Sequence, residues 1–113
     1  MKALSVMQPW ANMIADGKKT IETRWWRTGY RGPLLICSSK HPSIPPAGCA
    51  IAICQLADCR PMRPDDEPAA GCLYMPNIFA WILKDIQRIT PVPVRGQPGL
   101  FDVEIVNDKV YQV

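Results

Sequence analysis

The segment Gly17–Arg24, with the sequence Gly-Lys-Lys-Thr-Ile-Glu-Thr-Arg, marks the point where the chain changes from a helix to a strand. Before it, apolar side chains recur at helical spacing over residues 10–14, and Pro9 suits the first turn of a helix. Gly17 stands where the left-handed residue at the end of a helix belongs, so we expect the helix to stop there. After it, residues 20–27 are rich in β-branched and aromatic side chains, which favours a strand.

Much of the remaining chain also predicts short strands. Apolar runs bounded by glycine and proline indicate strands at residues 2–6, 33–37 and 49–56. Residues 100–106 and 109–113 are expected to form a hairpin around the turn Asn107-Asp108.

Residues 78–89 fit two structures. Their isoleucines suit a helical stripe, but Phe, Trp and Ile dominate and the following segment alternates in polarity. We therefore expect a strand with a bend at Lys84-Asp85. One early helix with short flanking helical segments, many short strands and much proline together predict an α+β protein that is mainly β, organised as a small mixed barrel.

The acidic segment and the cysteines have simple interpretations. Residues 60–72 are expected to form a loop whose acidic run, Asp65-Asp66-Glu67, is solvated. The five cysteines form an odd set without a Cys-x-x-Cys pair, which favours reduced thiols in the cytoplasm. Because Cys49, Cys54 and Cys59 cannot converge on one ion from a single strand, we expect small buried thiols and no metal or cofactor.

Length and composition predict a single globular domain over residues 1–113. With 48% hydrophobic and 20% charged residues, the sequence predicts neither a disordered chain nor a membrane protein. The N-terminus lacks the pattern of a signal peptide, so we expect a cytoplasmic protein, with a monomer favoured. Residues 1–40 carry a net charge of +5 and the rest of the chain −2, an asymmetry typical of a surface that meets phosphate groups.

The basic charge meets a carboxylate in the segment that follows the helix. Along an extended strand, Thr20, Glu22 and Arg24 point to one face, and Lys19 reaches in from the turn. Two cations keep the carboxylate ionised, so it can accept hydrogen bonds from a base edge while the cations contact phosphate. From spacing alone, an ion-pair cluster on a solvated strand face is the simpler interpretation.

The helix start and the aromatic residues add further candidates. A helix start presents unpaired N–H groups that suit a phosphate, and Gln8 adds an amide there. Alternatively, Gln8 caps the helix and Trp10 packs in the core, which we expect for Trp10. Strand alternation lets only one of Trp25 and Trp26 face inward; Trp26 shares the parity of Glu22, so we expect it to be the more accessible to a ligand.

The motif Gly17-x-Lys19-x-x-Glu22-x-Arg24 resembles the signature of the ASCH (activating signal cointegrator homology) domain family. Further blocks resemble the same family in the same order, at residues 4–11, 26–28, 30–36, 48–49, 79–81 and 93–101. The resemblance implies a PUA-like β-barrel with a cleft lined by the helix start and by Lys19, Glu22 and Arg24. Relatives often carry an insertion after the strand at residues 33–37, so we expect a more open cleft here.

The resemblance implies a module that binds RNA or a modified nucleoside, with DNA as an alternative nucleic acid. The residues expected to contact the ligand are Gln8, Lys19, Glu22, Arg24, Trp26, Arg27, Tyr30, Arg31 and Lys40. Because surface charges contribute little to folding, alanine at Lys19 or Arg24 is expected to weaken binding with little loss of stability.

An enzyme acting in the same cleft is the main alternative function. Some bacterial members of the family remove the acetyl group from acetylcytidine with a Lys, a Thr and a Glu. Lys19 matches that Lys, but Glu22 occupies the position of the Thr, and a carboxylate is a poor substitute for an acylated hydroxyl. As an amidohydrolase or ribonuclease, the chain would use Lys19 and Glu22 as catalytic residues; we expect little acetylcytidine hydrolysis. A third possibility is a protein-interaction module built on the proline-rich acidic loop.

Overall fold

Seven strands and two short α-helices make up the computed structural model, which describes residues 1–113. In chain order the elements are β1 (Lys2–Val6), α1 (Trp10–Ala15), β2 (Ile21–Arg24), β3 (Gly32–Ser38), β4 (Cys49–Pro61), a 3-10 turn η1 (Pro64–Asp66), α2 (Glu67–Ala70), β5 (Phe79–Pro93), β6 (Leu100–Val106) and β7 (Lys109–Gln112). The structure is thus mainly β with few helices, as the sequence predicts. No helix has the length and apolar character needed to span a membrane.

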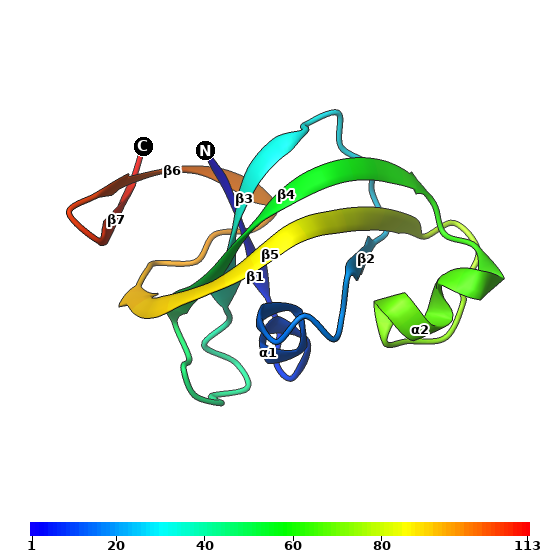
Figure 1. Ribbon diagram of the computed structural model, residues 1–113, viewed down its shortest axis with the longest axis horizontal. Coiled ribbons are helices and arrows are strands. Elements are labelled where there is room, and N and C mark those ends of the chain that lie inside the picture. Colours follow the sequence, from blue (N-terminus) through cyan, green and yellow to red (C-terminus); the bar gives the residue numbers. More distant parts are fainter.

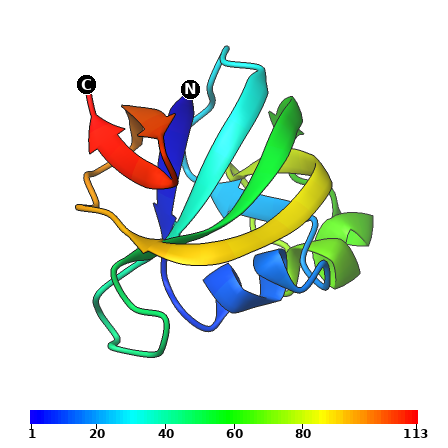
Figure 2. The ribbon, with the colours of Figure 1, turned by 60° about the vertical axis from the view of Figure 1, so that its left-hand side comes forward.

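The strands form one curved sheet in the order β2-β5-β4-β3-β1-β6-β7. Only β1 and β3 are parallel; every other neighbouring pair is antiparallel. Figures 1 and 2 show the long strands β4 and β5 curving around α1, with α2 at their far end. The sheet does not close on itself, so the expected barrel is corrected to an open, strongly curved sheet.

A gap on one side of the molecule accounts for the open sheet. The end of β5 and the β6–β7 hairpin are separated by a cavity of about 500 Å³, lined by Ile53, Ile89, Val92, Ile105 and Val110 among others. No backbone ladder links β5 to β7 across this cavity.

The core lies on both faces of the sheet. In β3, Leu34 and Ile36 pack with α1 on one face, whereas Leu35 and Cys37 pack with Phe101 on the other. Burial on both faces explains the continuous apolar run of this strand, because successive side chains of a strand point to opposite faces.

Helix α1 ends where the sequence predicts. Gly17 has a positive φ of 76°, and its N–H donates to the Ile14 carbonyl while the Lys18 N–H donates to Met13. These two hydrogen bonds form a Schellman motif, which satisfies the last carbonyls of a helix. The reversal delivers Lys19 to the start of β2.

Several other predicted elements can be compared with the structure. The strand expected at residues 78–89 is β5, and Asp85 has a positive φ of 53°, at the expected bend. The C-terminal hairpin turns at Asn107 and Asp108, both with positive φ. Strand β4, by contrast, runs five residues beyond the expected end at Leu56, and β2 stops at Arg24 rather than at residue 27.

The acidic segment is not a solvated loop, which corrects the prediction for residues 60–72. Asp66 is only 6% exposed, and its carboxylate accepts two hydrogen bonds from the Arg60 guanidinium, at 2.7 and 2.8 Å. It also accepts the Arg63 backbone N–H at 2.8 Å. The hydrogen bonds from Arg60, helped by that of Arg63, lower the pKa of Asp66 to about 2 despite its burial.

The Asp66 contacts predict a specific loss of stability in acid. A carboxyl group with a lowered folded-state pKa stabilises the fold above its unfolded pKa of about 4, and this contribution is lost as the pH falls toward 2. Asp66→Asn is therefore expected to lower the free energy of unfolding by about 1–2 kcal/mol at pH 7 and by much less at pH 2. Urea denaturation at several pH values measures the difference, with exposed Asp65→Asn as the control. Equal losses at both positions, or a loss independent of pH, would contradict this assignment.

The cysteines are all free thiols. Cys37, Cys54 and Cys59 are buried, as expected, whereas Cys49 and Cys72 are half-buried. Burial raises the pKa of Cys37 and of Cys54 to about 12, so both stay protonated at neutral pH. These two thiols are therefore packing groups rather than nucleophiles.

Candidate ligand-binding site

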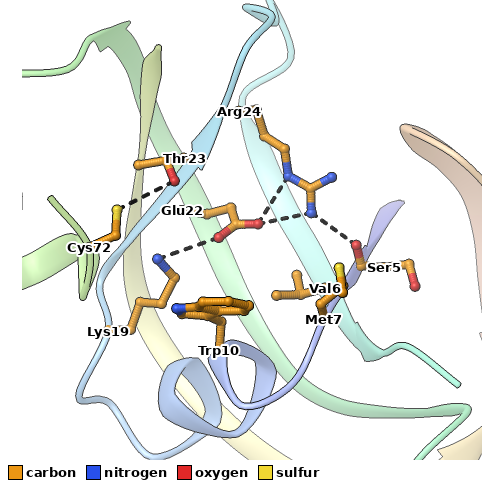
Figure 3. Close-up of a pocket in the computed structure, with 9 residues that line it drawn as sticks. All are labelled: Ser5, Val6, Met7, Trp10, Lys19, Glu22, Thr23, Arg24 and Cys72. Carbon is orange, nitrogen blue, oxygen red and sulfur yellow. Dashed lines mark hydrogen bonds and ion pairs between the residues drawn. The ribbon is translucent and has the colours of Figure 1, made fainter. Parts of the chain in front are cut away.

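A pocket of about 360 Å³ opens between the start of α1 and strand β2 (Figure 3). Its lining consists of Ser5, Val6, Met7, Trp10, Lys19, Glu22, Thr23, Arg24 and Cys72. The volume falls within the range of about 300–1,000 Å³ that is usual for small-molecule sites. We call it the Trp10 pocket.

Strand pairing explains why Glu22 and Arg24 face this pocket. In the antiparallel ladder, Glu22 lies opposite Trp81 and Arg24 lies opposite Phe79. Residues opposite one another in such a ladder point to the same side of the sheet. Trp81 is fully buried in the cluster that packs against α1, so Glu22 and Arg24 project toward the same helix.

Lys19, Glu22 and Arg24 form one charged cluster, which we call the ionic triad. The Glu22 Oε1 atom lies 3.5 Å from the Lys19 Nζ, and Oε2 lies 3.0 Å from the Arg24 Nε and 2.9 Å from its Nη2. The structure thus brings together the three residues that the motif singled out. Their net charge is +1, and the carboxylate is held between two cations (Figure 3).

The members of the ionic triad differ greatly in exposure. Lys19 is 1% exposed and Glu22 is 6% exposed, whereas the Arg24 side chain is 23% exposed. The Lys19 ammonium also donates to the Ala70 carbonyl at the end of α2, where a cation is favoured. Lys19 and Glu22 are therefore buried rather than on a solvated surface, which corrects the expectation that Lys19→Ala would cost little stability.

Arg24 is the member of the ionic triad that remains available to a ligand. Its Nε donates to Glu22, and its Nη2 forms an ion pair with the same carboxylate and donates to the Ser5 carbonyl at 2.9 Å. The Nη1 atom donates to no group of the protein. A guanidinium fixed on one edge and free on the other is well placed to donate to an anionic oxygen.

Trp10 forms the apolar wall of the pocket, which corrects the expectation that it packs in the core. It is 38% exposed, and Figure 3 shows its indole edge-on below the Glu22 carboxylate, with Lys19 on one side and Met7 on the other. Met7 is 54% exposed. Sequence reasoning missed Trp10 and Met7 as site residues, although both lie in a block that carries the family resemblance.

The pocket also contains one hydroxyl and one thiol. Thr23 Oγ1 and Cys72 Sγ lie 3.8 Å apart within hydrogen-bonding reach of each other. Thr20, which was expected to share the cleft-facing side of the strand, does not line the pocket. Strand β2 begins only at Ile21, and Thr20 belongs to the turn.

Of the two neighbouring tryptophans, Trp25 is the more exposed, whereas Trp26 was expected to be. Trp25 is 77% exposed, whereas Trp26 packs edge-on against Trp81 with ring centroids 4.8 Å apart. The Trp81 indole N–H also donates to the Trp26 carbonyl at 3.3 Å. Neither Trp25 nor Trp26 lines the Trp10 pocket.

Gln8 is buried and supports the fold, which corrects the expectation that it contacts a ligand. It is 2% exposed; its Oε1 accepts the Asn12 N–H, and its Nε2 donates to the Ser38 hydroxyl, both at 2.9 Å. Gln8 therefore caps α1 and ties it to β3, as the alternative interpretation proposed.

The remaining predicted contact residues lie away from the Trp10 pocket. Arg27 stacks over the Phe79 ring, and the Tyr30 hydroxyl donates to the Pro33 carbonyl. Arg31 donates to the Thr28 and Tyr30 carbonyls and pairs with Asp58. Lys40 lines a different cavity. The basic residues that are close in sequence thus do not all line one pocket.

This protein is a curved, mainly β domain in which an ionic triad lies beside an exposed indole. In comparisons with known proteins, the family model for the ASCH domain matches residues 4–93. The chain belongs to the ASCH domain family.

Curated relatives include the human and mouse proteins named activating signal cointegrator 1, which are 26% and 25% identical over 135 residues. Each match covers 96% of this chain but only 23% of the relative, so the chain spans about a quarter of their length.

Crystal structures of ASCH proteins from Zymomonas mobilis share the fold. The chain is 16% identical to one of them, with a TM-score of 0.70, and the match covers 99% of this chain and 86% of the other. A point variant gives 15% identity and a TM-score of 0.64, covering 99% and 88%. At this identity the likeness concerns the fold alone.

Proposed function

We propose that this ASCH domain binds single-stranded RNA and holds one base, plain or modified, in the Trp10 pocket. The observation that supports this most is the buried ionic triad next to a half-exposed indole. An aromatic face stacks on any base, and such stacking contributes about 1–3 kcal/mol per base in single-strand binding proteins. A fixed carboxylate and a guanidinium add directional hydrogen bonding.

The two polar groups would contact different parts of a nucleotide. The Oε1 atom of Glu22 faces only Lys19 and has a second lone pair, so it can accept a hydrogen bond from a base amino group. The free Nη1 of Arg24 would donate to a phosphate oxygen. Of the residues named by the motif, we therefore assign ligand contacts to Glu22 and Arg24, and a supporting position to Lys19.

The same contacts favour binding over hydrolysis. Both oxygens of Glu22 lie against the cations Lys19 and Arg24, so the carboxylate is engaged as their counter-ion. The Lys19 ammonium is engaged by Glu22 and by the Ala70 carbonyl. Neither group is free to act on a bound substrate as the catalytic Lys and Thr of the amidohydrolase branch would.

Arg24→Ala is expected to weaken binding of a labelled single-stranded RNA about 10- to 100-fold, because it removes one charge-assisted hydrogen bond to a phosphate. Affinity of the wild type should fall steeply with salt, with a logarithmic slope near −0.7 for each phosphate that the protein neutralises. Fluorescence anisotropy at two salt concentrations measures both effects. Lys84→Ala, which removes an exposed cation outside the pocket, serves as the control and should change affinity less than threefold.

Two results would count against this proposal. RNA binding that is absent, or that is indifferent to salt and to Arg24→Ala, would remove the leading function. Robust release of cytidine from acetylcytidine by the wild type would make the pocket an enzyme's active site instead. A DNA strand of the same sequence in the same titration shows whether the ribose 2′-hydroxyl contributes to binding.

A further inference from the structure

A second cavity, of about 410 Å³, shares the lining residue Ser5 with the Trp10 pocket. Two loops contribute most of its lining: residues 39–41 with Gly48 between β3 and β4, and residues 94–98 between β5 and β6. Ser5, at the end of β1, lines both cavities. We call the second cavity the Lys40 pocket.

The Lys40 pocket is basic without a compensating acid. Lys40 and Arg95 are both exposed, and neither takes part in any of the six ion pairs of the protein. His41 also lines the cavity, and no Asp or Glu does. This differs from the Trp10 pocket, where a carboxylate neutralises one of the two cations. Of the two cavities, the Lys40 pocket therefore carries the stronger unbalanced positive charge.

Close packing at two glycines holds the walls of this cavity. A Cβ atom at Gly48, whose φ is +68°, would lie 3.2 Å from both Cγ and Cε of Lys40, so the lysine stem runs directly over this glycine. A Cβ atom at Gly96 would lie 3.2 Å from the Ser5 hydroxyl. The two loops are joined by a hydrogen bond from the Val94 N–H to the Gly48 carbonyl, at 3.0 Å. The position of Lys40 is thus set by packing rather than left to a free loop.

Neutral donors complement the two cations. The backbone N–H groups of Arg95, Gly96 and Gln97 donate to no acceptor within the protein. The hydroxyls of Ser5 and Ser39 belong to the same lining. Cations together with free backbone N–H groups and hydroxyls form the donor set by which proteins bind phosphate. Only two of the twelve lining residues are hydrophobic, so the cavity does not suit a base or an apolar side chain.

From these observations we infer that the Lys40 pocket binds a phosphodiester group of the strand whose base occupies the Trp10 pocket. The inference rests on the proposed function and narrows it: the ligand is an oligonucleotide that passes over Ser5, not a free nucleoside. Arg24 fits this path, because its Nη2 donates to the Ser5 carbonyl at the boundary between the two pockets. Arg95 thereby becomes a contact residue, 55 positions from Lys40 in the sequence.

The test compares two labelled 2′-O-methyl tetranucleotides of identical sequence, one with phosphodiester links and one with neutral methylphosphonate links. The Lys40→Ala/Arg95→Ala variant is expected to bind the phosphodiester probe about 10- to 100-fold more weakly than the wild type. The magnitude of its salt slope should fall by about 0.7 for each phosphate that the variant no longer neutralises. The neutral probe should bind the variant and the wild type equally, because it offers no charge to the Lys40 pocket.

The Lys84→Ala/Lys109→Ala variant loses the same charge from exposed positions outside both pockets, and we expect less than a threefold change. Equal losses for both probes would show that Lys40 and Arg95 do not act on the phosphate charge, and would overturn the inference. So would an unchanged affinity of the Lys40→Ala/Arg95→Ala variant while Arg24→Ala still weakens binding, but that result would leave the proposed function intact. Failure of the wild type to bind the phosphodiester probe and an unmodified RNA of the same sequence would overturn both.

Discussion

Replacing Glu22 with leucine is expected to lower the free energy of unfolding by about 3–5 kcal/mol, because it leaves a buried ammonium without its counter-ion. Lys19 is 1% exposed, and its remaining partner would be the Ala70 carbonyl. Arg24, whose side chain is 23% exposed, can turn toward solvent and loses less. Urea denaturation followed by tryptophan fluorescence measures the change.

A double variant distinguishes the effect of leaving Lys19 without its counter-ion from the effect of losing the Glu22 side chain. The Lys19→Met/Glu22→Leu variant removes both buried charges and should recover much of the stability, because an apolar pair of similar volume often replaces a buried ion pair without loss. Asp58→Leu breaks the exposed pair with Arg31 and should cost no more than about 1 kcal/mol. The assignment fails if Glu22→Leu costs as little as Asp58→Leu, or if the double variant is less stable than Glu22→Leu alone.

Trp10→Ala is expected to reduce affinity for single-stranded RNA by a factor of about 5 to 150, the equivalent of losing one base stack of about 1–3 kcal/mol. Trp10→Phe should retain part of the affinity, because a smaller aromatic face still stacks. The measurement is fluorescence anisotropy with a labelled oligonucleotide, and thermal melting establishes that each variant is folded.

Trp25→Ala provides the matched control, since this side chain is 77% exposed but lies outside the Trp10 pocket. We expect it to change affinity less than threefold. A larger loss from Trp25→Ala than from Trp10→Ala would move the base-binding surface from the pocket to the bend after β2.

Local signals in the sequence predicted the elements that depend on a single turn. Gly17 ends α1, and the Asn107-Asp108 turn forms the C-terminal hairpin, because each requires a positive φ that few residues adopt readily. The open edge of the sheet was not predictable in the same way. Whether β5 pairs with β7 depends on the curvature of the whole sheet, which no short segment encodes.

The candidate site likewise contains some residues that local sequence signals predict and others that they do not. Lys19, Glu22 and Arg24 meet because they belong to one turn and one short strand, where the alternation rule holds. The expected accessibility of Trp26 was wrong, because its side chain packs against Trp81 and does not line the pocket. Arg95 could not be found from sequence, because a loop hydrogen bond between Val94 and Gly48 brings it near Lys40.

The open sheet leaves the outer edge of β5 uncovered beyond Leu83, since β2 pairs only with residues 79–82. A long free edge would ordinarily invite a strand from another molecule to add to it. Here the edge is unsuited to that addition: Pro91 and Pro93 have no N–H to donate, and β4 and β5 pair with three register shifts. The prolines and irregularities of β5 thus protect the molecule from edge-to-edge aggregation.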